Sequence, residues 1–193
     1  MENAQGAVME PARVTIERTY SLSLWLADES TSLLQLYTDL QGFTDPPPGL
    51  PACQLQLPGP PGEDWGRARR LKHHRDDCHV LADHLRRLLD EQRELNQTQH
   101  HLHRQLEFTI TSLEGLAVNL GLILASLGEG EGQGQGEGEG QEGGEELDHG
   151  PPSQPPHWEA KVKGYHVIAH YGNLIGRTVG DLEQLRDSME PEA

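Results

Sequence analysis

A chain of 193 residues is long enough to bury one hydrophobic core, and its net charge of −16 excludes the basic surface that nucleic-acid-binding proteins present. The same charge argues against attraction to anionic membranes, and no apolar run reaches the roughly 20 residues needed to span a bilayer. The first residues lack the basic and apolar regions of an ordinary secretory signal.

The first predicted helix spans residues 14–41 and follows a flexible N-terminus at residues 1–13. Large apolar residues in it recur at steps of three, four and seven, which places them on one helical face: Leu22, Leu26, Leu33, Tyr37 and Leu40. Gly42 is predicted to end the helix in the left-handed conformation. Repeated prolines between residues 43 and 63 exclude both a helix and a central strand, so this connection is predicted to be long and extended.

The second and third helices are predicted at residues 64–94 and 98–127. The break between them is so short that the two helices must be antiparallel neighbours. Gly115 and Gly121 lie inside the third helix, where we expect another helix to pack closely. The second helix begins with alternating basic, histidine and acidic residues between Arg67 and Asp77, a pattern that we interpret as a solvated face.

Residues 128–150 consist largely of Gly, Glu and Gln and are predicted to form a disordered acidic loop. Prolines after this loop set the start of a fourth helix at residues 157–188, and residues 190–193 form a tail. Its predicted buried stripe comprises Val162, Tyr165, Ile168, Ala169, Gly172, Ile175, Val179, Leu182 and Leu185. Trp158 and Lys161 lie in its first turn, where they either cap the core or form a contact surface.

Four amphipathic helices without alternating segments predict an all-α four-helix bundle. The first and third connections are long enough to return along a whole helix, and the second is short. Connections of long, short and long length predict the up-up-down-down topology of long-chain cytokines. The ordered part of the chain is therefore predicted to be a single cytokine domain over residues 14–189.

Two stretches of the fourth helix, WEAKVKGYHV at residues 158–167 and RTVGDLEQL at residues 177–185, resemble the final helix of the cardiotrophins. In the first helix, residues 20–22, 33–37 and 40–42 are similar to the same region of the cardiotrophins and ciliary neurotrophic factor. The resemblance covers all four helices and places the chain with this group of the interleukin-6 cytokine family. It implies an extracellular, monomeric cytokine that is secreted without an ordinary signal peptide and activates JAK/STAT signalling by clustering receptors.

The resemblance also implies which residues contact those receptors. Members of the group that use the leukaemia inhibitory factor receptor carry a Phe-x-x-Lys pair at the start of the last helix, and Trp158 and Lys161 occupy the matching positions. Arg177 matches an arginine that ciliary neurotrophic factor uses for its alpha receptor. The family binds its shared signalling receptor with exposed faces of the first and third helices, and Trp25, off the main apolar stripe, is our candidate there.

Other residues bear on chemistry and processing. Cys53 and Cys78 are interpreted as two free thiols, and Asn96 fits the N-glycosylation pattern. His166 and His170 are four residues apart and could bind zinc, but carboxylate or cysteine partners at matching spacing are missing, so we expect neither a metal nor a cofactor.

The sequence contains no nucleophile elbow, zinc-protease or di-iron motif, and we expect no enzymatic activity. A cytokine of this kind needs no nucleic acid and no membrane insertion. The alternative function is an intracellular helical-bundle scaffold or interaction protein without receptor activity, which the missing secretory signal, the free thiols and the acidic loop would also fit.

Overall fold

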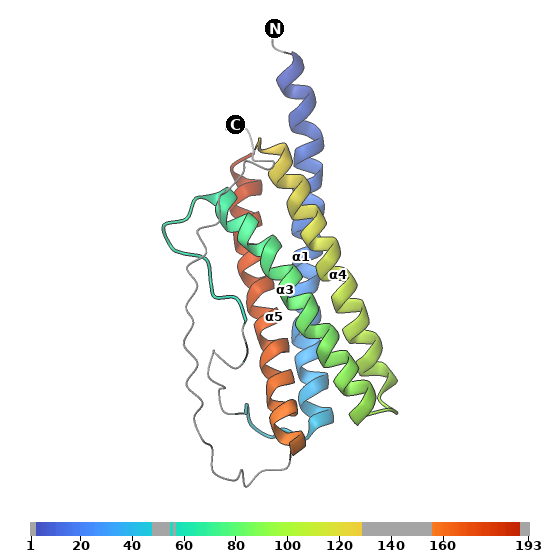
Figure 1. The fold of residues 1–193 in the computed structure, drawn as a ribbon. Helices are drawn as coiled ribbons and strands as arrows, with labels where there is room; N and C mark the ends of the chain where they lie inside the picture. Colours follow the sequence, from blue (N-terminus) through green and yellow to red (C-terminus); the bar gives the residue numbers. More distant parts are fainter. Residues whose placement is uncertain (1–2, 48–54, 56, 129–155, 190–193) are drawn as a thin grey trace.

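The computed structural model describes residues 3–47, 55, 57–128 and 156–189. Four helices make up the fold: α1 (Asn3–Gln41), α3 (Arg67–Leu95), α4 (His100–Ser126) and α5 (Pro156–Asp187). α1 and α3 run in one direction and α4 and α5 in the other (Figure 1). The predicted all-α bundle with up-up-down-down topology is confirmed.

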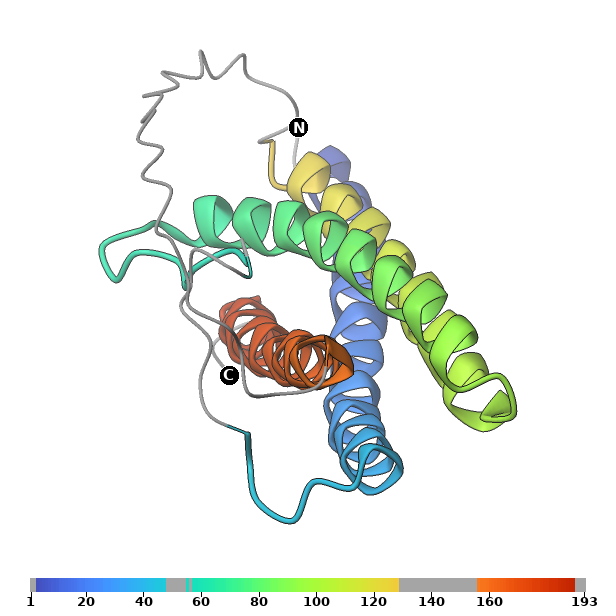
Figure 2. The same ribbon diagram turned by 60° about the horizontal axis from the view of Figure 1, so that its bottom comes forward.

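Each helix packs against two antiparallel neighbours. α1 contacts α4 and α5, and α3 contacts the same two helices, so α1 and α3 lie diagonally across the bundle. Figure 2 shows α3 and α4 side by side along their length, as the short connection between them requires. The long first connection leaves the lower end of α1 in Figure 1 and returns to the upper end, where α3 begins.

The core is built almost entirely from leucine, isoleucine and tyrosine side chains of all four helices. Fully burying one such aliphatic side chain contributes roughly 1.5–3 kcal/mol to the stability of the fold. Members of the core include Ile16, Leu26, Leu33, Leu81, Leu85, Leu106, Leu113, Ile168 and Leu182.

The buried face of α5 is wider than its predicted stripe. Val167, Tyr171 and Leu174 are buried although the stripe does not contain them, whereas Tyr165 and Val179 are only partly buried. The physical reason is that α5 packs against both α1 and α3, so two adjacent faces of the helix are covered.

The N-terminal part of α1 corrects one prediction. Residues 3–13 are helical rather than flexible, and the first turns of α1 project beyond the ends of the other helices (Figure 1). Three alanines together with Gln5, Met9 and Glu10 favour a helix here, although Gly6 and Pro11 do not. The predicted acidic loop lies outside the described residues apart from Gly128, and so does the predicted tail.

Two predictions about glycine have different outcomes. Gly42 has a φ of 73° and ends α1, with the Phe43 N–H donating to the Thr38 carbonyl over 3.1 Å, so the predicted left-handed end is confirmed. The close packing expected at Gly115 and Gly121 is wrong. A Cβ atom at Gly115 would meet open space, and one at Gly121 would make an ordinary contact of 3.8 Å.

α4 is apolar enough by length and composition to cross a membrane. In the bundle it packs against α1 and α3 and buries 11 residues, and its remaining large apolar side chains lie on the outside.

Candidate functional site

The first turn of α5 carries an aromatic cluster at the lower end of the bundle. Trp158 is partly exposed, and its ring meets that of Phe43 edge to face, with centroids 5.4 Å apart. Tyr165, two turns further along α5, also contacts Phe43, with ring centroids 5.9 Å apart. The segment that follows α1 therefore holds Trp158 in place while part of the indole stays accessible to solvent.

Lys161 lies one helical turn after Trp158, on the same side of α5. Its backbone carbonyl accepts a hydrogen bond of 3.1 Å from the Tyr37 hydroxyl, which ties this turn to α1. Its side chain is partly exposed, and the described residues offer it no ion pair. An anchored aromatic ring and a cation with spare donors thus share one small surface, which suits an apolar pocket bordered by acceptors on a partner.

A second aromatic pair joins α1 to α4 on a different face. Trp25 and Phe108 meet edge to face with ring centroids 5.0 Å apart and an angle of 82° between the rings. Each side chain is 45% exposed, so much of the pair's apolar area still faces water. Exposed aromatic side chains that are held in place by one another are frequent anchors of protein interfaces.

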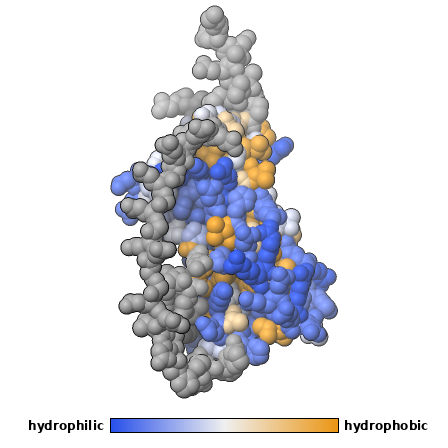
Figure 3. All heavy atoms as spheres, viewed as in Figure 1, coloured by the Kyte–Doolittle hydropathy of each residue, from blue (hydrophilic) through white to orange (hydrophobic). Residues whose placement is uncertain are grey.

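The Trp25–Phe108 pair continues into further exposed apolar side chains. Val14 of α1 and both Val118 and Leu122 of α4 are between 44% and 62% exposed. Helical spacing places the two α4 residues on the same outward face as Phe108. In Figure 3 the hydrophobic colour gathers at the upper right, where the last turns of α4 pass α1. We call these five residues the α1/α4 apolar face.

Arg177 does not project freely into solvent. It is partly buried between α5 and α3, and its Nε and Nη2 atoms have no hydrogen-bond partner among the described residues. It lines a depression of about 220 Å³ together with Arg70, Asp181, Gln184 and the end of the first connection at residues 61–63. Arg177 therefore forms part of the wall of this depression, with the Nε and Nη2 atoms of its guanidinium buried.

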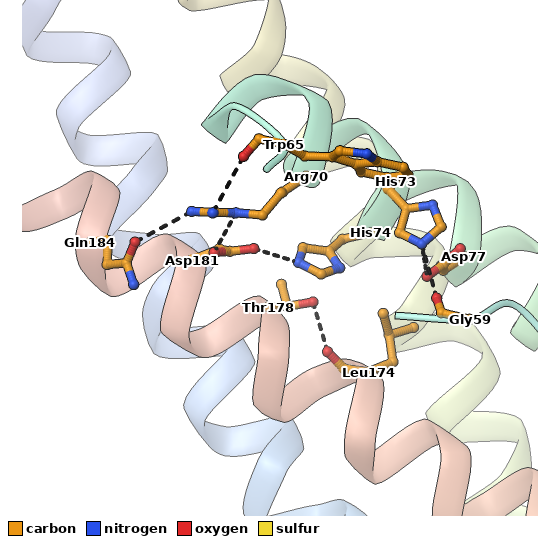
Figure 4. A network of polar contacts seen from close by, with 10 residues as sticks. All are labelled: Gly59, Trp65, Arg70, His73, His74, Asp77, Leu174, Thr178, Asp181 and Gln184. Atoms are coloured by element: carbon orange, nitrogen blue, oxygen red, sulfur yellow. Dashed lines mark hydrogen bonds and ion pairs between the residues drawn. The ribbon is translucent and has the colours of Figure 1, made fainter. Parts of the chain in front are cut away.

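Behind the depression lies a polar seam between α3 and α5 (Figure 4). His74 Nε2 lies 2.7 Å from Asp181 Oδ2, and Arg70 Nε lies 3.0 Å from Asp181 Oδ1. His74 is completely buried and Asp77 is 3% exposed. The interpretation of residues 67–77 as a solvated face is therefore wrong for these positions, because the face of α3 that carries them packs against α5.

Burial is the main cause of the pKa shifts of the ionisable side chains in and beside this seam. It lowers the pKa of His74, although the hydrogen bond to Asp181 acts in the opposite direction. It likewise lowers the pKa of His170, and the nearby Arg177 lowers it further. Burial raises the pKa of the Asp77 carboxyl, with His73 and Arg177 opposing the shift. Each of these groups is thus biased toward its neutral form.

Two further predicted residues lie away from these surfaces. Asn96 ends α3, and its Nδ2 atom, the atom that a glycan would occupy, donates to Gln92 Oε1 over 2.8 Å. Cys78 is a buried free thiol, whereas Cys53 lies outside the described residues. Within the described ranges no three His, Cys, Asp or Glu side chains are arranged to hold a metal ion.

The amino-acid sequence matches a known protein family. A family model described as the LIF / OSM family matches residues 23–181, from the middle of α1 to the last turns of α5. The chain belongs to the LIF / OSM family.

Its similarity to individual proteins is consistent with this assignment. Cardiotrophin-2 of Mus musculus is 30% identical over 179 residues, which cover 89% of this chain and 83% of that protein. Cardiotrophin-1 of Mus musculus is 31% identical and that of Homo sapiens 29% identical, each over 188 residues covering 88% of this chain and 84% of the relative. This LIF / OSM member is thus a cardiotrophin-like cytokine of the interleukin-6 family.

Sequence reasoning missed several residues of these surfaces in the LIF / OSM chain. Phe43 and Phe108 are its two phenylalanines, and each contacts a predicted site tryptophan. Phe108 could have been found, because it lies off the apolar stripe of its helix as Trp25 does. Phe43 could not, since it belongs to a connection whose path the sequence does not specify.

Proposed function

We propose that this LIF / OSM member is a secreted cytokine that clusters the shared signalling receptor of the interleukin-6 family with the leukaemia inhibitory factor receptor and thereby activates JAK/STAT signalling. It acts by holding receptors at fixed positions relative to one another and has no catalytic site. The observation that supports the proposal best is the presence of two separate, solvent-accessible aromatic anchors on one bundle: the partly exposed Trp158 with Phe43, and the half-exposed Trp25 with Phe108.

Each anchor is assigned to one receptor. Trp158 inserts into an apolar pocket of the leukaemia inhibitory factor receptor, and Lys161 pairs with acceptors at the rim of that pocket. The α1/α4 apolar face binds the shared signalling receptor. Arg177, in the wall of its depression, is the proposed contact for an alpha receptor. Rigid helices hold the surfaces at fixed positions, so one monomer brings receptor-bound kinases together.

The test is a signalling assay on cells that carry the shared receptor and the leukaemia inhibitory factor receptor. We expect STAT phosphorylation at nanomolar concentrations of the purified protein. The double variant Trp158→Ala with Lys161→Ala should lose at least roughly 2 kcal/mol of binding free energy, about thirtyfold in dose, because buried aromatic anchors dominate interface energies.

The matched control is Val80→Ala, which removes a 41% exposed apolar side chain from α3 away from both anchors. It should signal like the unchanged protein. If the folded, helical protein elicits no STAT response on these cells, the proposal fails and the intracellular scaffold becomes the better explanation.

A further inference from the structure

The polar seam between α3 and α5 is rich in ionisable side chains for an interface between two helices. α3 contributes Arg70, His73, His74 and Asp77, and α5 contributes Arg177 and Asp181. With both histidines neutral, two guanidinium groups face two carboxylates. The seam is electrically balanced in this state, which is the condition for holding charges away from water.

The geometry specifies which nitrogen of His74 carries the proton. Asp181 accepts the hydrogen bond of 2.7 Å, because a carboxylate has no proton to donate, so the Nε2 atom of neutral His74 is the donor. The opposite ring nitrogen, Nδ1, is buried and has no hydrogen-bond partner among the described residues. A second proton on this ring would therefore create a buried N–H group for which those residues supply no acceptor.

Asp181 already accepts from His74 and pairs with Arg70. Two other buried carboxylate oxygens lack a hydrogen-bond partner among the described residues: Asp77 Oδ2, 3.4 Å from His73, and Glu29 Oε1 of α1, which acts on Tyr171. Neither is among the groups that shift the pKa of His74, so neither serves as its counter-ion. α4 has no ionisable residue after Glu114, which is engaged by Arg86 further down α3.

The remaining charges lie on the outside of the seam. Glu63, in the first connection, is exposed at the mouth of the depression. Glu183 accepts from Tyr20 on the side of α5 that faces α1. His84 of α3 and His170 of α5 lie further along the two helices. His170 is near Arg177 and near His84, and both histidines would add positive charge on protonation. A proton on His74 therefore leaves the seam with a net positive charge.

We propose that this seam is an acid-sensitive clasp, in which protonation of His74 loosens the second half of α5 from α3 as the pH falls below about 6.5. Arg177 and its depression lie on the part that loosens. The Trp25–Phe108 pair, which joins α1 to α4, does not lie in the seam. The clasp goes beyond the proposed function, and its test uses no receptor.

The direction of the pH effect on stability follows from the pKa shifts. The pKa of His74 and that of His170 are lower in the fold than their ordinary value of 6.5, so their contribution to stability is present above that pH and is lost below it. The raised pKa of Asp77 acts oppositely, since its protonation on acidification relieves a buried charge. That relief removes one of the two carboxylates that balance the guanidinium groups, so it offers no counter-ion to protonated His74.

Hydrogen exchange of α5 tests the clasp. After correction for intrinsic rates, the opening equilibrium of amides 174–187 should rise about fivefold between about pH 6.5 and 5.5, because one proton with an ordinary pKa of 6.5 is coupled to opening. In His74→Gln, which keeps a donor for Asp181 but cannot be protonated, only the contribution of His170 should be left, so the rise should be clearly smaller than in the unchanged protein. The control His79→Gln, an exposed position on the same helix, should behave like the unchanged protein. An equally steep rise in His74→Gln overturns the proposal.

A second measurement on the unchanged protein covers the case in which His74→Gln does not fold. In the closed bundle the His74 ring, followed by NMR, should stay neutral below pH 6.5 while the opening of α5 increases, because only the opened state takes up the proton. The proposal is overturned if the His74 ring becomes protonated near pH 6.5 while α5 keeps its protection, or if the opening of α5 does not change with pH.

Discussion

The Tyr37 side chain of α1 packs against α5 directly over Gly164. A Cβ atom at Gly164 would collide with the Tyr37 hydroxyl and would also lie 2.7 Å from Leu88 Cδ1 of α3. The Tyr37 hydroxyl donates to the Lys161 carbonyl from the same position. Three helices therefore meet at one residue without a side chain, one turn after the proposed receptor contact.

Gly164→Ala should lower the free energy of unfolding by about 1–3 kcal/mol, because the added methyl group must displace a buried tyrosine and a buried leucine. Gly176→Ala is the matched control in the same helix, where a Cβ atom meets open space. It should raise stability by up to about 1 kcal/mol, since alanine is the better helix former. Urea denaturation of both variants measures the difference, and equal effects would contradict the close approach.

The Trp25–Phe108 contact predicts coupled effects of substitution. Trp25→Ala and Phe108→Ala should each weaken binding to the shared signalling receptor more than tenfold while leaving binding to the leukaemia inhibitory factor receptor unchanged. The double variant should lose less than the sum of the single losses, because the two rings hold each other in place. Surface binding assays with each receptor measure both effects. Strict additivity would show that the rings act independently.

The polar network at the lower end of the bundle predicts an effect on stability. Gln41 Nε2 and Asn96 Nδ2 both donate to the buried Gln92 Oε1, over 2.9 and 2.8 Å. Gln92→Leu removes their shared acceptor and should cost about 1–3 kcal/mol of unfolding free energy.

The control for Gln92→Leu is Gln35→Leu. Gln35 is exposed and bonds Asp39 within α1, so its replacement should change stability by less than about 0.5 kcal/mol. A loss at Gln35 as large as that at Gln92 would contradict the role of burial.

The thiol of Cys78 predicts a chemical test of the fold. Burial raises its pKa to about 12, with a smaller contribution from Asp77, so almost none of it is thiolate near neutral pH. Alkylation by iodoacetamide at about pH 8 should be at least about a hundredfold slower in the native protein than in concentrated urea. Peptide mass spectrometry follows Cys78 separately from Cys53. Rapid labelling of Cys78 in the native protein would show that this part of the core opens readily.

The sequence alone determined the helices, their order and their direction. Apolar residues at helical spacing and the lengths of the three connections are local properties, and they are sufficient for an up-up-down-down bundle. The sequence prediction starts α1 at residue 14, whereas the helix begins at Asn3 and continues through Gly6 and Pro11, two residues that usually interrupt helices. The two site tryptophans and Lys161 could be named from motifs or from their position off the apolar stripe, and their receptor roles remain proposals.

Which side chains contact one another is known from the tertiary structure and not from the sequence. It paired Trp158 with Phe43 and Trp25 with Phe108, and it placed Gly164 rather than Gly115 at a helix crossing. It also buried His74 against Asp181, 107 residues away, where the sequence pattern indicated a solvated face. Helical periodicity states which residues share a face but not which helix covers that face, and this depends on the side-by-side packing of elements far apart in the chain.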